Sequence, residues 1–114
     1  MTFFENFTSA LKQKWLEYFQ ANRSWIALQM KVTVVKTPDG GQRPSSLFIL
    51  GVINAIEPKL TNLMVPFYKL NSDADALVTV LGLHFDPDLE IAKRSEDAAK
   101  TKDAEIVALL PDSE

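Results

Sequence analysis

Acidic side chains alternate with other residues in two short segments, and oxygen atoms at that spacing can surround a calcium ion. Residues 84–90 read HFDPDLE and contain the only histidine, His84, while residues 71–75 read NSDAD. A calcium loop of this kind also requires a glycine at its sixth position and a glutamate at its twelfth. Other residues stand there: Ile91 and Asp97 when counted from Asp86, and Ala76 and Gly82 when counted from Asn71. We therefore expect no metal at either segment.

Both segments fit the start of a helix. Asp86 is placed to cap a helix whose first residue is Pro87, and Asp88 and Glu90 then fall in its first turn. Aspartate is a favoured N-cap, proline is favoured at the first helical position, and acidic side chains are stabilised near the positive end of the helix dipole. Residues 71–75 precede a second helical pattern in the same way. The sequence therefore predicts two capped helix starts.

His84 is the side chain with the clearest catalytic potential. A catalytic triad or a metal site needs convergent partners, and one histidine without any cysteine supplies few of them. The motifs GxSxG, GxGxxG, HExxH and the Walker loop are absent from the sequence. We therefore expect a structural role for His84 and a protein that is not an enzyme and needs no cofactor. An enzyme or small-ligand binder that uses His84 and Asp86 is the least favoured alternative.

Length and composition indicate one folded domain. The chain has 114 residues, of which 46% are hydrophobic and 24% charged, as in globular domains generally. Without cysteine it forms neither a disulfide nor a thiolate metal site. The longest apolar stretch, residues 47–53, is too short to span a bilayer, which takes roughly 20 residues, and no signal peptide is recognisable. We expect a soluble, cytoplasmic protein.

The first third of the chain predicts two helices. Apolar residues recur at helical spacing on one face of residues 4–20: Phe4, Phe7, Leu11, Trp15, Tyr18 and Phe19. Asparagine favours turns, so this helix should end near Asn22. Ser24 could then cap a short second helix over residues 25–30.

A short extended segment is expected near residues 31–37. Its valines favour an extended backbone, and the PDGG sequence at residues 38–41 favours a turn. Three outcomes are open for it. The segment is irregular, or it pairs with a second copy and makes a homodimer, or it forms a small ribbon with residues near Gln42.

The middle of the chain predicts a buried helix followed by shorter ones. Residues 47–56 read LFILGVINAI, which is apolar nearly all round and follows a serine pair suited to capping. Pro58 should begin the next helix, because proline suits the first helical position. The expected core face of that helix is Leu60, Leu63, Met64, Phe67 and Leu70. Gly82 should then end a helix over residues 74–81.

Residues 92–114 are charged and contain few large apolar side chains, so they read as a mobile tail. The predicted organisation is a helical domain over residues 1–91 and this tail. The fold class is mainly α, a compact single domain of about four to six helices with the short extended segment near 31–37 and a flexible C-terminal tail.

The leading functional hypothesis is a small adaptor or assembly factor that binds another protein of unknown identity. If Arg23, Trp25 and Arg43 form an exposed patch, they are good anchors, because tryptophan and arginine are enriched among binding hot spots. The apolar residues Ile106, Leu109 and Leu110 near the end of the tail could dock as a helical turn in a partner groove.

The charge distribution bears on two alternative functions, nucleic-acid binding and contact with a membrane. Residues 1–43 hold six basic and three acidic side chains, although the whole chain has a net charge of −3. That excess is too small to favour nucleic-acid binding. Contact of the aromatic, weakly basic N-terminal helix with an anionic membrane surface is the runner-up hypothesis.

Several longer segments resemble a known family. LKQKWLEYFQANRSWI, DGGQRPSSLFILGVINAIEP and LNSDADALVTVLGLHFDPDLE are similar to small uncharacterised cyanobacterial proteins that form a domain of unknown function, over about residues 9–91. The resemblance rests on Trp15, Arg23, Trp25, Arg43-Pro44, Glu57-Pro58, Leu70-Asn71, Leu81-Gly82-Leu83 and Asp86-Pro87. It implies a cyanobacterial source and a link to photosynthetic or thylakoid physiology, including a place at the thylakoid membrane surface. It implies no reaction, ligand or partner.

Overall fold

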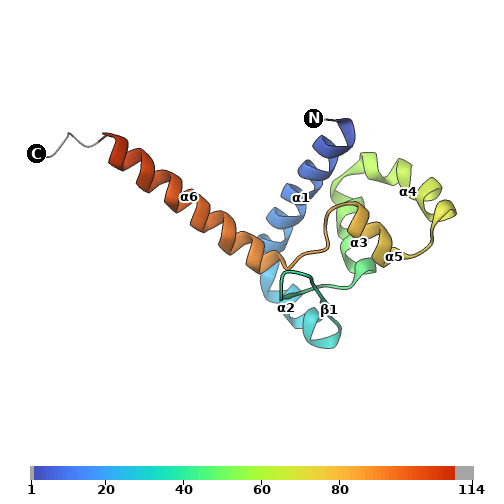
Figure 1. The fold of residues 1–114 in the computed structure, drawn as a ribbon. Helices are drawn as coiled ribbons and strands as arrows, with labels where there is room; N and C mark the ends of the chain where they lie inside the picture. The colour runs from blue at the N-terminus through green and yellow to red at the C-terminus, as the bar shows by residue number, and fades with distance from the viewer. Residues whose placement is uncertain (1, 110–114) are drawn as a thin grey trace, which may run out of the picture.

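The computed structural model describes residues 2–109, and it describes the side chains of residues 2–100. This part of the chain forms six helices and a two-stranded ribbon: α1 (Phe3–Ala21), α2 (Arg23–Val32), β1 (Val35–Lys36), β2 (Gln42–Arg43), α3 (Ser46–Ile56), α4 (Pro58–Leu70), α5 (Ala74–Val80) and α6 (Pro87–Leu109). Helices α1 to α5 gather into one globule, and α6 extends away from it (Figure 1). The predicted mainly helical domain is confirmed.

Capping side chains fix the helix starts. Asp73 Oδ1 accepts hydrogen bonds from the backbone N–H groups of residues 75 and 76, at 2.9 and 3.3 Å. Asp86 Oδ1 does the same for residues 88 and 89, at 2.8 and 3.2 Å. Ser45 caps α3, and Glu57 caps α4 with Pro58 at its first position. Both alternating acidic segments are therefore helix starts, as predicted.

Three local expectations need correction. Helix α2 begins at Arg23 with Asn22 as its cap, because the chain passes from α1 to α2 without room for the turn that a cap at Ser24 would need. Helix α6 does not end before residue 92, where the tail was expected to begin, since its pattern of charged residues and alanines continues the helix to residue 109. Leu70 does not face the core: it lies in the last turn of α4 and is 85% exposed.

The core lies where α1, α3 and α5 meet. Its buried members include Leu11, Trp15, Phe19, Ile26, Ile49, Ile53, Leu60, Val78, Leu81 and Leu83. Most of the predicted face of α1 is therefore used, although Phe4 at its start is exposed. The ribbon pairs Val35 with Arg43 and Lys36 with Gln42. The expected extended segment thus finds its partner within the chain, the third of the outcomes left open.

Candidate protein-interaction surface

Arg43 is buried inside the globule, with 1% of its surface exposed. Its guanidinium donates from Nε to His84 Nδ1 (2.9 Å), from Nη1 to the Pro44 carbonyl oxygen (2.8 Å) and from Nη2 to Ser46 Oγ (3.2 Å). Ser46 Oγ donates in turn to the Asp75 carboxylate. Burial lowers the pKa of Arg43 and the nearby Asp75 opposes that shift, so the group stays charged. We call these contacts the Arg43 joint.

Asp86 ties the turn between the two strands to the start of α6. Its Oδ2 accepts a hydrogen bond from the backbone N–H of Gln42 (2.9 Å), while its own N–H donates to Asp39 Oδ2 (3.0 Å). A β-carbon added to Gly41 would lie 2.1 Å from Asp86 Oδ2, so only glycine permits this close approach. The ribbon, α3, α5 and α6 are thereby held in one arrangement.

The Arg43 joint corrects one expectation about the site. Arg43 does not belong to an exposed patch with Arg23 and Trp25, because its guanidinium is enclosed by acceptors from distant parts of the chain. His84 is one of those acceptors and has a structural contact. Among the described residues, no group of three or more His, Cys, Asp or Glu side chains is placed to hold a metal ion.

Helix α2 has two apolar faces. Ile26 is fully buried on one of them, and Met30 packs against the core beside it. Trp25, Leu28 and Val32 recur at the spacing i, i+3, i+7, which places them together on another side of the helix. That side faces solvent, since the exposed fractions are 45% for Trp25, 61% for Leu28 and 80% for Val32.

Helix α3 also exposes apolar residues to solvent, and it carries no charged residue. Leu47, Gly51 and Ala55 are spaced four apart and therefore share one face. All three are exposed, Leu47 by 70%. A β-carbon added to Gly51 would meet nothing within 4 Å, so the middle of this face is open. The solvent side of α3 is therefore apolar at these three positions.

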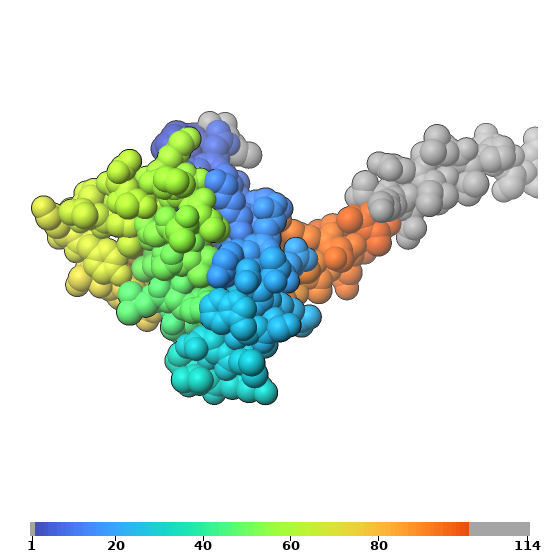
Figure 2. All heavy atoms as spheres, turned by 180° about the vertical axis from the view of Figure 1, so that it is seen from behind, coloured from blue at the N-terminus to red at the C-terminus, as the bar shows by residue number. Residues whose placement is uncertain are grey.

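The Trp25 ring joins the two exposed faces. Its centroid lies 5.3 Å from that of Phe48 on α3, and the rings are inclined by 59°. Figure 2 shows the light blue to cyan α2 beside the green α3 on one face of the molecule. We call this region the α2–α3 surface, and it consists of Trp25, Leu28, Val32, Leu47, Phe48, Gly51 and Ala55. Large exposed apolar patches of this kind mark interaction sites.

The charges around the α2–α3 surface differ between its two helices. Helix α2 carries Arg23 and Lys31 and no acidic residue, and α3 carries no charge at all. Arg23 Nε lies 3.1 Å from Asp88 Oδ1 at the start of α6, while Lys31 is exposed in the last turn of α2. The surface is therefore apolar, with basic side chains on α2, whereas Leu47 on α3 lines a hollow together with Asp73 and Asp75.

The α2–α3 surface contains one of the residues proposed from the sequence and several that were missed. Trp25 lies in it, and Arg23 is exposed nearby. Ile106, Leu109 and Leu110 lie outside the described side chains. The i, i+3, i+7 spacing of Trp25, Leu28 and Val32 was a usable signal, because Ile26 and Met30 already supply a separate core face.

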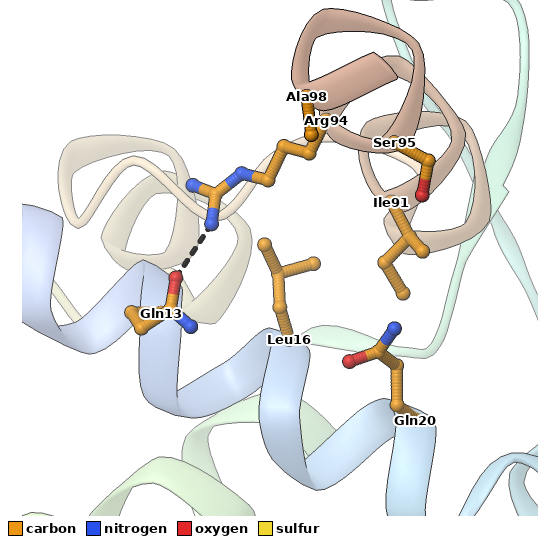
Figure 3. A pocket seen from close by; sticks show the side chains of 7 residues that line it. All are labelled: Gln13, Leu16, Gln20, Ile91, Arg94, Ser95 and Ala98. Carbon is orange, nitrogen blue, oxygen red and sulfur yellow. Dashed lines mark hydrogen bonds between the residues drawn. The ribbon is translucent and has the colours of Figure 1, made fainter. Parts of the chain in front are cut away.

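Helix α6 is anchored to α1 by its first two turns. Lys12 pairs with Glu90 at 3.3 Å, and Arg94 Nη1 donates to Gln13 Oε1 at 2.6 Å. Beyond them the two helices separate around an open pocket of about 240 Å³ lined by Gln13, Leu16, Gln20, Ile91, Arg94, Ser95 and Ala98 (Figure 3). The pocket marks where α6 leaves the globule, and all of residues 92–100 are exposed.

A second apolar hollow lies between α4 and α5. It measures about 150 Å³ and is lined by Phe67, Leu70, Asn71, Ala76, Leu77 and Val80. Asp73 and Asp75 lie in the loop and first turn beside it. We call it the α4–α5 groove.

Comparison with known proteins identifies a family. Residues 1–112 match the model of a family described as a family of unknown function (DUF5331). No curated protein matches the chain, and no solved structure does. None of the helices in the described part of the chain has the length and apolar character needed to cross a membrane.

Proposed function

The chain belongs to this family of unknown function (DUF5331), and we propose that it is a non-enzymatic adaptor or assembly factor that binds another protein through the α2–α3 surface. The observation that carries the proposal is the second apolar face of α2, where Trp25, Leu28 and Val32 are exposed although Ile26 already anchors the helix. Interface cores are depleted of charge and enriched in aromatic residues.

The cost of this exposure supports a role in binding. Burying apolar surface contributes about 25 cal/mol per Å², so exposed side chains such as Leu28 and Leu47 forgo stabilisation that a partner can supply. Trp25 is the expected anchor, since it is already held by Phe48 and by a hydrogen bond from Nε1 to Asn22 Oδ1 of 3.1 Å. A rigid aromatic side chain binds with little loss of conformational entropy.

Paired substitutions on the full chain test the proposal. Leu28→Asp places a charge on the α2–α3 surface. Val65→Asp is its matched control, because Leu28 and Val65 are both 61% exposed and Val65 lies on α4. Proteins captured from a lysate of the source organism are identified by mass spectrometry for the parent chain and both variants. A partner kept by Val65→Asp and lost by Leu28→Asp supports the proposal, and a partner kept by both variants contradicts it.

Contact with a membrane surface is the second candidate function. Most of the aromatic face of α1 is unavailable for it, since Trp15 and Phe19 are buried in the core. Phe3 and Phe4 remain exposed at the start of the helix and favour this candidate. Flotation with anionic liposomes at low salt tests it: recovery of the parent chain with the vesicles, and loss of recovery in a Phe3→Ser, Phe4→Ser variant, are the expected results.

The cyanobacterial source and the link to thylakoid physiology are proposals that rest on the sequence resemblance. They predict that the chain fractionates with thylakoid membranes or their assembly intermediates in such an organism. Uniform recovery in the soluble fraction, with no membrane-associated partner, would contradict this part of the proposal.

A further inference from the structure

We propose that protonation of His84 opens the Arg43 joint and loosens the ribbon, so that the joint acts as a pH-sensitive latch. His84 lies in the linker between α5 and α6, and its side chain is partly buried. The inference does not depend on the proposed function, because it concerns contacts inside the globule and not the α2–α3 surface.

The hydrogen bond between Arg43 and His84 fixes the protonation state of the imidazole. Arg43 Nε donates to His84 Nδ1 at 2.9 Å. A guanidinium has only donors and keeps its charge, so this bond requires a lone pair on Nδ1. His84 is therefore neutral in the closed joint, and its one ring proton is on Nε2.

A proton on His84 Nδ1 is incompatible with this contact. The ring nitrogen would become a donor that points at another donor, the Nε–H of Arg43. Protonation would also place a second positive charge beside the guanidinium of Arg43, a residue that is 1% exposed. Like charges at this distance repel more strongly where water is largely excluded. The ring or the guanidinium must then move, and the joint opens.

The other charged groups around the linker come from α1, the turn between the strands, α5 and α6. Each of them already has a partner within the chain: Lys12, Asp39, Asp75, Asp86 and Glu90. Among the described side chains, Arg43 is the one that forms a hydrogen bond with the His84 ring. The carboxylates favour positive charge in this region and Arg43 opposes it, so their balance sets the pH of opening. The exclusion between the proton and the Arg43 contact holds at any pH.

Opening of the joint acts on the ribbon, because other contacts keep α6 in place. Two side-chain contacts between α1 and α6 lie outside the joint and hold the start of α6 on the globule. The ribbon connects α2 to α3, and each of its strands has only two residues. Arg43 belongs to one strand and pairs with Val35 on the other. Loss of the His84 contact should therefore loosen residues 35–43 and the linker, while the core is retained.

An NMR titration of the full chain is the first test. His84 is the only histidine, so its ring signals report its protonation without overlap. Between about pH 8 and pH 5, histidine is the only side chain of this composition whose charge ordinarily changes, since cysteine is absent. We expect the Arg43 Nε–H signal and the His84 ring signals to change together, with the same midpoint.

His84→Asn supplies the matched control. The asparagine amide oxygen can accept the Arg43 Nε–H near the position of Nδ1, and it does not titrate. The Arg43 signal should therefore stay constant over the same pH range in this variant. Circular dichroism verifies that the variant is folded.

Hydrogen exchange measures the loosening in both chains. The Gln42 N–H, which donates to Asp86 Oδ2, reports the ribbon, and the Phe85 N–H reports the linker. The Asn71 N–H at the end of α4 is the reference. Comparison of the parent chain with His84→Asn at the same pH removes the pH dependence of the exchange chemistry itself.

The expected effect follows from linkage to one proton. Such an opening raises the open fraction by at most about tenfold per pH unit. The exchange ratio of parent chain to variant at Gln42 and Phe85 should rise by up to this factor per unit below about pH 6.5, where histidine in peptides titrates. The ratio at Asn71 should stay constant.

Three results would overturn the latch. One is protonation of His84 with an unchanged Arg43 Nε–H signal, another is a His84 ring that stays neutral down to about pH 5, and the third is a constant exchange ratio at Gln42 and Phe85. If His84→Asn does not fold, the titration of the parent chain alone decides. None of these results bears on the α2–α3 surface, so the proposed function stands or fails separately.

Discussion

The Arg43 joint and the α2–α3 surface lie in the same small globule. Both depart from the usual distribution, in which charged groups are exposed and apolar groups are buried. The joint encloses a charged guanidinium with 1% exposure, whereas the surface leaves Leu28 61% exposed and Leu47 70% exposed. The joint satisfies its donors from within the chain, through His84, Pro44 and Ser46. The surface has no covering element in the described part of the chain.

The comparison separates structural from functional departures from the rule that apolar groups are buried and polar groups exposed. A buried charge that is hydrogen-bonded by its own chain holds several elements in place and needs no ligand. An exposed apolar surface gains by being covered. The four predictions below test that distinction, from the largest expected effect on stability to the smallest.

Arg43→Met should destabilise the protein most. It removes a buried donor, and His84 Nδ1, the Pro44 carbonyl and Ser46 Oγ lose the hydrogen bonds that Arg43 donates to them. The expected loss is about 3 kcal/mol in the free energy of unfolding, measured by urea denaturation. Lys36→Met on the neighbouring strand, where the side chain is exposed, is the control and should change little. A loss below about 1 kcal/mol for Arg43→Met would show that the joint is dispensable.

Gly41→Ala should cost about 2 kcal/mol, because its β-carbon would lie 2.1 Å from Asp86 Oδ2 and displace the cap of α6. Gly51→Ala is the matched control. Its β-carbon meets nothing within 4 Å, and alanine is favoured in a helix interior by up to about 1 kcal/mol. Thermal unfolding should therefore show opposite shifts for the two substitutions, and equal shifts would contradict the close approach of turn and cap.

Glu57→Gln should reduce the dependence of stability on pH. The hydrogen bond from Lys14, followed by that from the backbone of Lys59, lowers the pKa of Glu57 below its ordinary value of 4.5. Because the folded-state pKa is lowered, the stabilisation is present above the ordinary pKa and is lost as the pH falls through the folded-state value. Urea midpoints at pH 7 and below pH 4.5 should differ less in Glu57→Gln than in the parent chain.

A matched carboxylate makes the pH measurement decisive. Glu96 is exposed on α6, and Glu96→Gln should leave the difference between the two pH values close to that of the parent chain. If both substitutions reduce the difference equally, the contact between Lys14 and Glu57 is not its source.

The locally encoded parts of the fold were the ones that the sequence predicted correctly. Asp73, Asp86 and Ser45 act on backbone groups two or three residues away, so their roles follow from the neighbouring letters. Burial of Arg43 depends on His84, which lies 41 residues further along the chain. A single sequence contains no sign of that convergence, and an isolated arginine is ordinarily exposed.

The candidate surface was only partly predictable for a related reason. Trp25 could be proposed as a binding residue from its residue type, whereas Leu28 and Leu47 resemble any core leucine in a helical pattern. LFILGVINAI predicted a helix buried on most sides, but neighbouring helices cover only part of α3 and leave Leu47, Gly51 and Ala55 exposed. The number of neighbours around a helix is a tertiary property, so an apolar sequence alone cannot distinguish a core face from a docking face.

The two faces of α2 give the smallest expected effect and the most direct test of the distinction. Leu28→Ala should change the free energy of unfolding by less than about 0.5 kcal/mol, because the side chain is already exposed. Ile26→Ala, two residues away and fully buried, should cost about 3 kcal/mol. Capture of a partner protein from a lysate should show the reverse order once Ile26→Ala is studied under conditions where it is folded. A large stability loss for Leu28→Ala would mean that Leu28 belongs to the core, and the α2–α3 surface would then lose its central member.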